Sequence, residues 1–305
     1  MIRLFATYQS VFDQILIYSL LAMSQYVVLR AGTFSVGSAA FAAIGGYTTA
    51  ILSTRSGWHP ALAIACGVVL GGVVSAIMAF PLSRLRGVFQ AVATMALVQV
   101  VVTIALNWED VTRGALGING IPKVATTGWL VVIVAFVVAL LHVLGRFSIG
   151  RAMDVIREDE TVAVSLGMSV AHYQRIAMIL SGLLAGLAGG LQACNSYTIK
   201  PEDFGFTLLV NGLAMAVLGG RTSVWGALVG AAVLTTLPEL FRVFADYRNV
   251  VQGALLMVII IYLPNGIADT LFGLAHDRRV RRLVTGLEPR AAAVSDSGAG
   301  SEVTR

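Results

Sequence analysis

The amino-acid sequence predicts an all-α fold, a polytopic membrane helix bundle of about eight to ten transmembrane helices. Of the 305 residues, 57% are hydrophobic and only 12% are charged, whereas ordinary soluble domains carry about 25% charged residues. The apolar residues gather into long runs, and about 20 such residues cross a hydrocarbon core of about 30 Å as a helix. Burial in a membrane therefore explains the composition better than two soluble domains.

Nine apolar runs approach the length of a transmembrane helix, and charged residues fall only toward their ends. The runs cover residues 11–29, 36–53, 59–83, 87–107, 128–145, 174–193, 206–220, 224–243 and 249–268. Runs 36–53 and 206–220 are short, so each is either a full span or a re-entrant or half helix. Residues 35–49 and 223–236 resemble each other, which fits either internal pseudo-symmetry or shared composition alone.

The chain has 32 glycines, and most of them lie within the apolar runs, often in pairs such as Gly45-Gly46, Gly71-Gly72 and Gly189-Gly190. Small residues allow the backbones of neighbouring transmembrane helices to approach closely. We therefore interpret these glycines as packing residues.

The distribution of arginine and lysine predicts the orientation in the membrane. Placing the long polar segment 146–175 in the cytoplasm gives the cytoplasmic side most of the basic residues, in agreement with the positive-inside rule. With nine spans, the N-terminus then lies outside and the C-terminus inside. We expect residues 1–275 to form the membrane domain, with a cytoplasmic loop at about 146–175. Residues 276–305 should form a cytoplasmic basic segment and a disordered tail, and the basic cluster comprises Arg278, Arg279, Arg281 and Arg282.

The sequence lacks the motifs that are typical of several classes of enzyme and metal-binding protein. The four histidines are far apart, neither lysine follows a glycine, and no metal-binding, serine-hydrolase or phosphate-binding motif is present. Cys66 and Cys194 lie in or beside apolar runs and resemble small hydrophobic residues. The basic residues are spread over short loops, which does not favour nucleic-acid binding. We therefore expect no cofactor, no metal site and no ATP hydrolysis in this chain.

Acidic residues at membrane depth are scarce. A proton- or sodium-coupled carrier usually keeps such residues as a relay, and the candidates here are Asp13 and Glu239, each near the end of an apolar run. We expect both to be interfacial residues solvated by headgroup water. This favours a permease driven by a partner over a carrier that works alone.

The polar segment between residues 150 and 175 predicts a short amphipathic helix over residues 151–166. Met153, Ile156, Ala163 and Leu166 recur at nearly helical spacing and define an apolar face, and Arg157, Glu158, Asp159 and Glu160 make the segment strongly charged. Gly167 stands where the helix should end. Such a helix is either a solvated connector or a docking element for a soluble partner.

Five stretches, in the right order, resemble the LivM-type permeases of branched-chain amino acid ABC transporters. They are residues 34–41 with 45–48, 84–96, 112–122, 150–160 with 165–168, and 218–227 with 263–267. The resemblance covers about residues 15–270. Gln90 departs from the pattern, because the family usually has an apolar residue at that position.

The resemblance implies a permease subunit of an importer in the cell inner membrane. Its expected partners are a second permease subunit in a heterodimer, two cytoplasmic ATP-binding subunits that hydrolyse ATP, and a soluble substrate-binding protein. The implied solute is a branched-chain amino acid or a related small polar molecule such as urea or a short amide. The alternatives are a secondary transporter that works alone and, far less favoured by the residues, an intramembrane enzyme.

Two groups of residues are candidates for this function. The ATPase-coupling loop would use Arg157, Glu158, Asp159, Glu160, Leu166 and Gly167. Uncharged polar residues would line the solute pathway, and the candidates are Gln90, Thr94, Asn119 and Asn211. Gln90 and Thr94 share one face of run 87–107, whereas Gln99 and Thr103 share the opposite face, so only one of these pairs can face the pathway.

Overall fold

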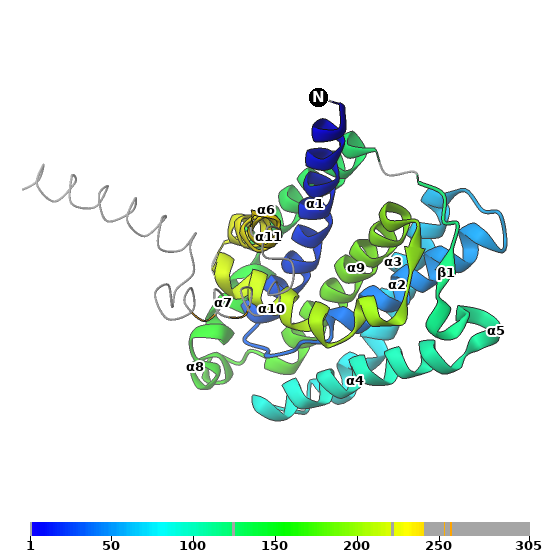
Figure 1. Ribbon diagram of the computed structural model, residues 1–305. Helices are drawn as coiled ribbons and strands as arrows, with labels where there is room; N and C mark the ends of the chain where they lie inside the picture. Colours follow the sequence, from blue (N-terminus) through cyan, green and yellow to red (C-terminus); the bar gives the residue numbers. More distant parts are fainter. Residues whose placement is uncertain (1, 124–125, 221–222, 241–252, 254–256, 258–305) are drawn as a thin grey trace, which may run out of the picture.

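The computed structural model describes residues 2–123, 126–220, 223–240, 253 and 257, and Figure 1 shows that they form a bundle of helices. The longer helices are α1 (Ile2–Arg30), α2 (Ser38–Thr54), α3 (Pro60–Leu82), α4 (Val88–Asn107), α6 (Thr127–Arg146), α9 (Val170–Ser196), α10 (Phe206–Gly219) and α11 (Val224–Leu240). The shorter elements are α5 (Glu109–Thr112), η1 (Gly114–Leu116), β1 (Ile118–Asn119), α7 (Ser148–Glu158), α8 (Glu160–Ser165), β2 (Thr198–Ile199) and η2 (Pro201–Phe204). The predicted all-α class is confirmed.

Six helical segments in the described part of the chain are long and apolar enough to cross a membrane. They are Gln9–Arg30, Pro60–Leu82, Val88–Asn107, Thr127–Arg146, Val170–Ser196 and Pro201–Gly219. Helices α2 and α11 arise from two further predicted runs, but each has only 17 residues. Of the predicted run 249–268 only residues 253 and 257 are described, and the expected tail 276–305 lies outside the described residues.

Helices α2, α3 and α9 pack together at the centre of the bundle, and glycines bring their backbones into contact. A Cβ atom at Gly45 of α2 would collide with the backbone of Gly186 in α9. A Cβ atom at Gly189 would likewise collide with the backbone of Ala42. Lipid tails are as apolar as leucine, so helices in a membrane associate through close packing of this kind. The glycines therefore have the packing role that their positions in the sequence predict.

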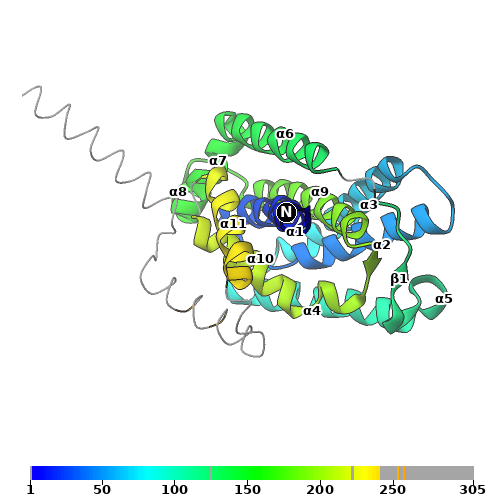
Figure 2. The same cartoon turned by 45° about the horizontal axis from the view of Figure 1, so that its top comes forward.

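Helix α1 packs against this centre and also contacts α6, α10 and α11. The hydroxyl groups of Ser24 in α1 and Ser181 in α9 share a buried hydrogen bond of 2.9 Å. Figure 2 shows α6 along one flank of the bundle and α4 along the opposite flank. Helix α4 therefore lies at the periphery, with one side turned away from the rest of the described chain.

Polar contacts gather at the two ends of the bundle. At one end, Arg30 of α1 forms a two-pronged ion pair with Asp154 of α7, with N–O distances of 2.8 and 2.7 Å. At the other end, β1 and β2 pair in antiparallel register, with Ile118 opposite Ile199. The charge distribution predicts that Arg30 and Asp154 lie on the cytoplasmic side and that β1 lies outside. The structure places these elements at opposite ends of the bundle.

The contact between Gly189 and Ala42 generates a stability prediction. Gly189→Ala should lower the free energy of unfolding by about 1–3 kcal/mol, because the added methyl group forces two backbones apart. Gly128→Ala is the matched control, since a Cβ atom there meets nothing within 4 Å. Thermal unfolding in detergent should show a lower melting temperature for Gly189→Ala alone. Equal melting temperatures would contradict the packing role.

Candidate functional site

The predicted amphipathic segment forms two helices, α7 and α8, and not one continuous helix over residues 151–166. Asp159 interrupts the helix with an extended backbone, at φ −153° and ψ 111°. Its carboxylate accepts hydrogen bonds from the amides of Thr161, at 2.7 Å, and Val162, at 3.2 Å. Aspartate side chains compete with helical backbone bonds in this way and favour the start of a new helix.

The apolar face of the segment also differs from the prediction. Met153, Ile156 and Ala163 are buried within the chain's own hydrophobic clusters, so these three side chains are closed to a partner. Leu166 does not share this face, because 64% of its surface is exposed. Ala163 lies within α8, whereas Leu166 follows the last helical residue, Ser165, so Leu166 does not continue the buried face.

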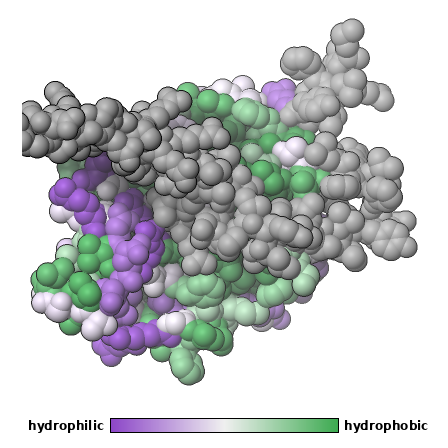
Figure 3. All heavy atoms as spheres, turned by 90° about the vertical axis from the view of Figure 1, so that its left-hand side faces the viewer, coloured by the Kyte–Doolittle hydropathy of each residue, from purple (hydrophilic) through white to green (hydrophobic). Residues whose placement is uncertain are grey.

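A different set of apolar residues faces outward on α8 and just after it. Val162 is 49% exposed and Val164 is 57% exposed, and both lie next to the exposed Leu166. In Figure 3, hydrophilic and hydrophobic residues lie side by side on the face of the molecule that was on the left in Figure 1, where α7 and α8 lie. We refer to Val162, Val164 and Leu166 as the α8 apolar surface.

Charged residues border the α8 apolar surface. Glu160 forms an ion pair of 3.1 Å with Arg86, in the turn between α3 and α4. Arg157 forms one of 3.0 Å with the neighbouring Glu158. Gly167 ends the segment at φ +78°, a left-handed conformation that glycine adopts without strain. The predicted end of the helical segment at Gly167 is confirmed, and α8 lies beside the α3–α4 turn.

Two contacts fix α7 on the bundle. The ion pair between Arg30 and Asp154 ties α7 to the end of α1, and the Arg30 side chain is largely buried. A Cβ atom at Gly32 would touch the backbone of Ile156 and Arg157 at 3.4 Å. The position of the α7–α8 segment is therefore set by the membrane helices to which it is tied.

The four pathway candidates occupy different environments. Gln90 is buried and donates a hydrogen bond of 3.2 Å to the carbonyl oxygen of Leu82. Thr94 is also buried, and its hydroxyl oxygen accepts a bond of 3.1 Å from the amide of Val36. Both therefore hold α4 against its neighbours within the chain.

Asn119 and Asn211, the other two candidates, lie on separate elements. Asn119 is exposed in β1, where its side chain accepts a hydrogen bond from Thr198 of β2. Asn211 is half-buried on α10. The structure does not bring the four predicted pathway residues together in one site.

The opposite face of α4 carries Gln99 and Thr103, and both are exposed. Gln99 lines a hollow of about 290 Å³ between α4 and α10. The hollow is otherwise lined by Val92, Met95, Ala96, Val98, Phe206 and Leu209. Of the two predicted pairs on α4, this one is open to contacts with other molecules.

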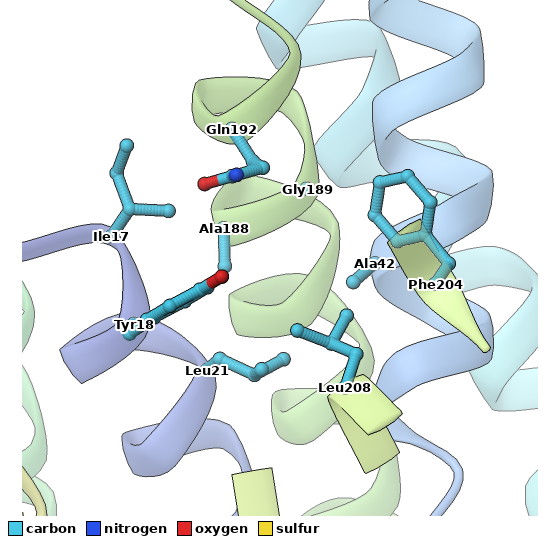
Figure 4. A pocket seen from close by; sticks show the side chains of 9 residues that line it. All are labelled: Ile17, Tyr18, Leu21, Ala42, Ala188, Gly189, Gln192, Phe204 and Leu208. Atoms are coloured by element: carbon cyan, nitrogen blue, oxygen red, sulfur yellow. The ribbon is translucent and has the colours of Figure 1, made fainter. Parts of the chain in front are cut away.

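A second, much smaller hollow of about 10 Å³ lies between α1, α2, α9 and the η2–α10 segment. Figure 4 shows Tyr18 and Gln192 as its polar side chains, among Ile17, Leu21, Leu208 and Phe204. The side-chain oxygen of Gln192 is buried and has no hydrogen-bond partner. Sequence reasoning missed Gln192, although an uncharged polar residue inside an apolar run is the same signal that singled out Gln90.

Asp13 differs from its predicted environment. It was expected to be solvated at the membrane interface, but it is 1% exposed in the interior of the bundle. Its Oδ1 atom has no hydrogen-bond partner. The packing of α1 against its neighbours covers the carboxyl group, which its position near the end of an apolar run did not reveal. Glu239 lies on α11.

Comparisons with known proteins agree with this architecture. The family model for the branched-chain amino acid transport system permease component matches residues 8–260. The chain is 32% identical to the high-affinity branched-chain amino acid transport system permease protein LivM of Salmonella typhimurium, over 83% of this chain and 68% of that protein. It is 29% identical to the permease protein LivH of the same organism, over 46% of this chain and 45% of LivH.

The similarity extends to a sugar permease. The chain is 27% identical to the L-arabinose transport system permease protein AraH of Escherichia coli, over 80% of this chain and 78% of AraH. No solved structure matches the chain.

The cap at Asp159 generates a prediction about acid sensitivity. Hydrogen bonds from the amides of Val162 and Thr161 lower the pKa of Asp159 below its ordinary value of 3.8. The stabilisation of α8 should be complete above the ordinary pKa and should disappear as the pH falls through the lowered pKa. Hydrogen exchange of residues 160–165, corrected for intrinsic rates, should show this loss of protection.

Asp159→Asn is the control, because asparagine also caps helices but does not titrate in this range. Its protection should stay constant with pH. A parallel loss of protection in both proteins would rule out the cap as the cause.

Proposed function

The chain belongs to the family of branched-chain amino acid transport system permease components, and from this we propose that it is the transmembrane subunit of an ABC importer. It is an integral membrane protein, and its family consists of transport permeases. The proposed solute is a branched-chain amino acid or a related small polar molecule such as urea or a short amide. ATP is hydrolysed by two separate cytoplasmic subunits, and a soluble protein delivers the solute. A second permease subunit completes the membrane part.

The α8 apolar surface is the observation that carries the proposal of an ATPase partner. Val162, Val164 and Leu166 are exposed in a segment that is otherwise polar, at the end of the bundle where the arginine bias predicts the cytoplasm. Three neighbouring exposed aliphatic side chains with a charged border are typical of a protein-binding surface. The apolar side chains would enter a cleft of the ATPase, and Glu160 and Arg86 would set the register.

The α7–α8 segment could pass a movement of the ATPase on to the membrane helices, because two ion pairs join it to them. Asp154 joins α7 to α1 through Arg30, and Glu160 joins α8 to the α3–α4 turn through Arg86. A movement of the ATPase would therefore displace the ends of α1, α3 and α4 together.

The similarity to LivM favours a branched-chain amino acid as the solute. The polar residues named on the membrane helices, including Gln99, Thr103 and Asn211, are mostly uncharged, and such residues suit a zwitterionic or neutral solute better than an ion. The identity to AraH is lower than the identity to LivM. Because AraH is named an L-arabinose permease, other small polar solutes remain candidates. Binding measurements on the cognate soluble protein would identify the solute.

Asp13 favours a second candidate, a carrier that works alone. A buried carboxyl group in a membrane helix is costly and marks ion or proton pathways in many transporters. The two functions differ in their response to Asp13→Asn. For the importer, uptake by the full complex should need ATP and should survive this substitution. A carrier should show uptake by this chain alone in ATP-free vesicles, driven by an ion gradient, and Asp13→Asn should abolish it.

The α8 apolar surface generates a prediction about coupling. Leu166→Asp should reduce both co-purification of the ATPase and solute uptake by about tenfold or more, because a charge replaces an apolar contact at the interface. Leu116→Asp is the matched control, since Leu116 is also an exposed leucine, at 78%, and lies beside β1 at the opposite end of the bundle. Both variants should reach the membrane in normal amounts. Normal uptake and ATPase recovery with Leu166→Asp would show that α8 is only a connector.

A further inference from the structure

Helix α4 has two polar faces, one buried within the described chain and one exposed on its outside. Gln90 and Thr94 are buried and hydrogen-bonded within the chain. Gln99 and Thr103 point out of the described bundle. We propose that this outer face of α4, with its hollow against α10, binds a transmembrane helix of a second, related permease subunit, and that Gln99 lies in the contact. This inference rests on the proposed function, because it assumes a second permease subunit.

The depth of Gln99 in the membrane is the first argument. Helix α4 runs from Val88 to Asn107, so Gln99 lies roughly 16 Å from the start of the helix and close to the middle of the span. A glutamine amide exposed to lipid tails leaves its donors and acceptor without partners, which costs free energy. A helix that offers polar groups at this depth would satisfy them.

The other exposed membrane helices serve as the comparison. In the middle of α3, the exposed side chains include Val73 and Ile77, and in the middle of α6 they include Val132 and Phe136. Such apolar faces suit lipid tails. On α4, Gln99 and Thr103 lie one turn apart among exposed apolar residues that include Met95, Val100 and Ile104. Among these three helices, α4 is the one whose exposed middle carries amide and hydroxyl groups.

The shape of this face supports a helix as the occupant. The hollow between α4 and α10 has a volume of about 290 Å³ and includes Gln99, Met95 and Phe206 in its lining. Side chains of one helix insert into such depressions between the side chains of two others. Methionine and glutamine are long side chains that can adjust to the surface of a partner.

The similarity to both LivM and LivH identifies the partner. These two proteins of Salmonella typhimurium are both named permease proteins of a high-affinity branched-chain amino acid transport system. Their names indicate that one system uses two different permease chains. The occupant we commit to is therefore a chain related to this one, and not a lipid, a second copy of this chain or its own run 249–268.

Site-specific photo-crosslinking in whole cells tests the proposal. The photoreactive residue p-benzoylphenylalanine replaces Gln99 in the full chain, and Phe136 on α6 is replaced in the control. Irradiation should join position 99 to a second permease of the same family, identified by mass spectrometry of the adduct, and position 136 should give at least fivefold less of that adduct. An adduct with residues 249–268, with a second copy of this chain, or with lipid alone at position 99 would overturn the proposal.

Gln99→Leu gives a second measurement that does not depend on a bulky probe. Loss of one interhelical hydrogen bond in a membrane weakens association by about threefold, so recovery of the second permease after detergent dilution should fall by about that factor. Val132→Leu on α6 is the control and should have no effect. Unchanged recovery with Gln99→Leu would contradict the contact.

The outcome also separates this inference from the proposed function. If the second permease crosslinks to position 136 and not to 99, the importer stands and the assignment of α4 is wrong. If no second permease is recovered and this chain transports solute alone, the proposed function fails as well.

Discussion

The close backbone contact between α2, α3 and α9 is the constraint on which the rest of the structure depends. Gly45, Gly186 and Gly189 leave no space for side chains at the points where these helices meet. Because apolar side chains gain little from leaving lipid, this backbone proximity supplies dispersion contacts that leucine-rich surfaces alone would not provide. The outer helices α4 and α6 are then free to carry polar or bulky residues on their exposed sides, since the centre does not need them.

Ion pairs and hydrogen bonds define the two ends of the molecule. At the predicted cytoplasmic end, the pair between Arg30 and Asp154 holds α7, and the pair between Glu160 and Arg86 holds α8. In the first pair Arg30 is largely buried and Asp154 is partly exposed, whereas in the second pair Arg86 is 80% exposed, so the second pair contributes little to stability. The coupling segment is thus joined to α1 by a partly buried ion pair and to the α3–α4 turn by an exposed one.

The sequence predicted the helices well, because the length and apolar character of a run decide whether it can form a membrane helix. It predicted the bounds of α3, α4 and α10 to within one or two residues. It could not predict the break at Asp159, where a local side-chain bond competes with helix continuation. It also could not choose between the two polar faces of α4 or place Asp13 inside the bundle. Those features depend on which helices become neighbours, and composition and spacing do not encode this directly.

The pairing of β1 with β2 has a mechanical consequence. Strand β1 follows α4 within a dozen residues, and β2 begins two residues after α9. The two strands are joined by backbone hydrogen bonds and by the bond between Asn119 and Thr198. A peripheral helix and a central helix are thereby tethered at the end opposite α8. If α4 moved along its own axis, the paired strands would transmit that movement to the end of α9. The two helices are therefore expected to move together at this end of the bundle.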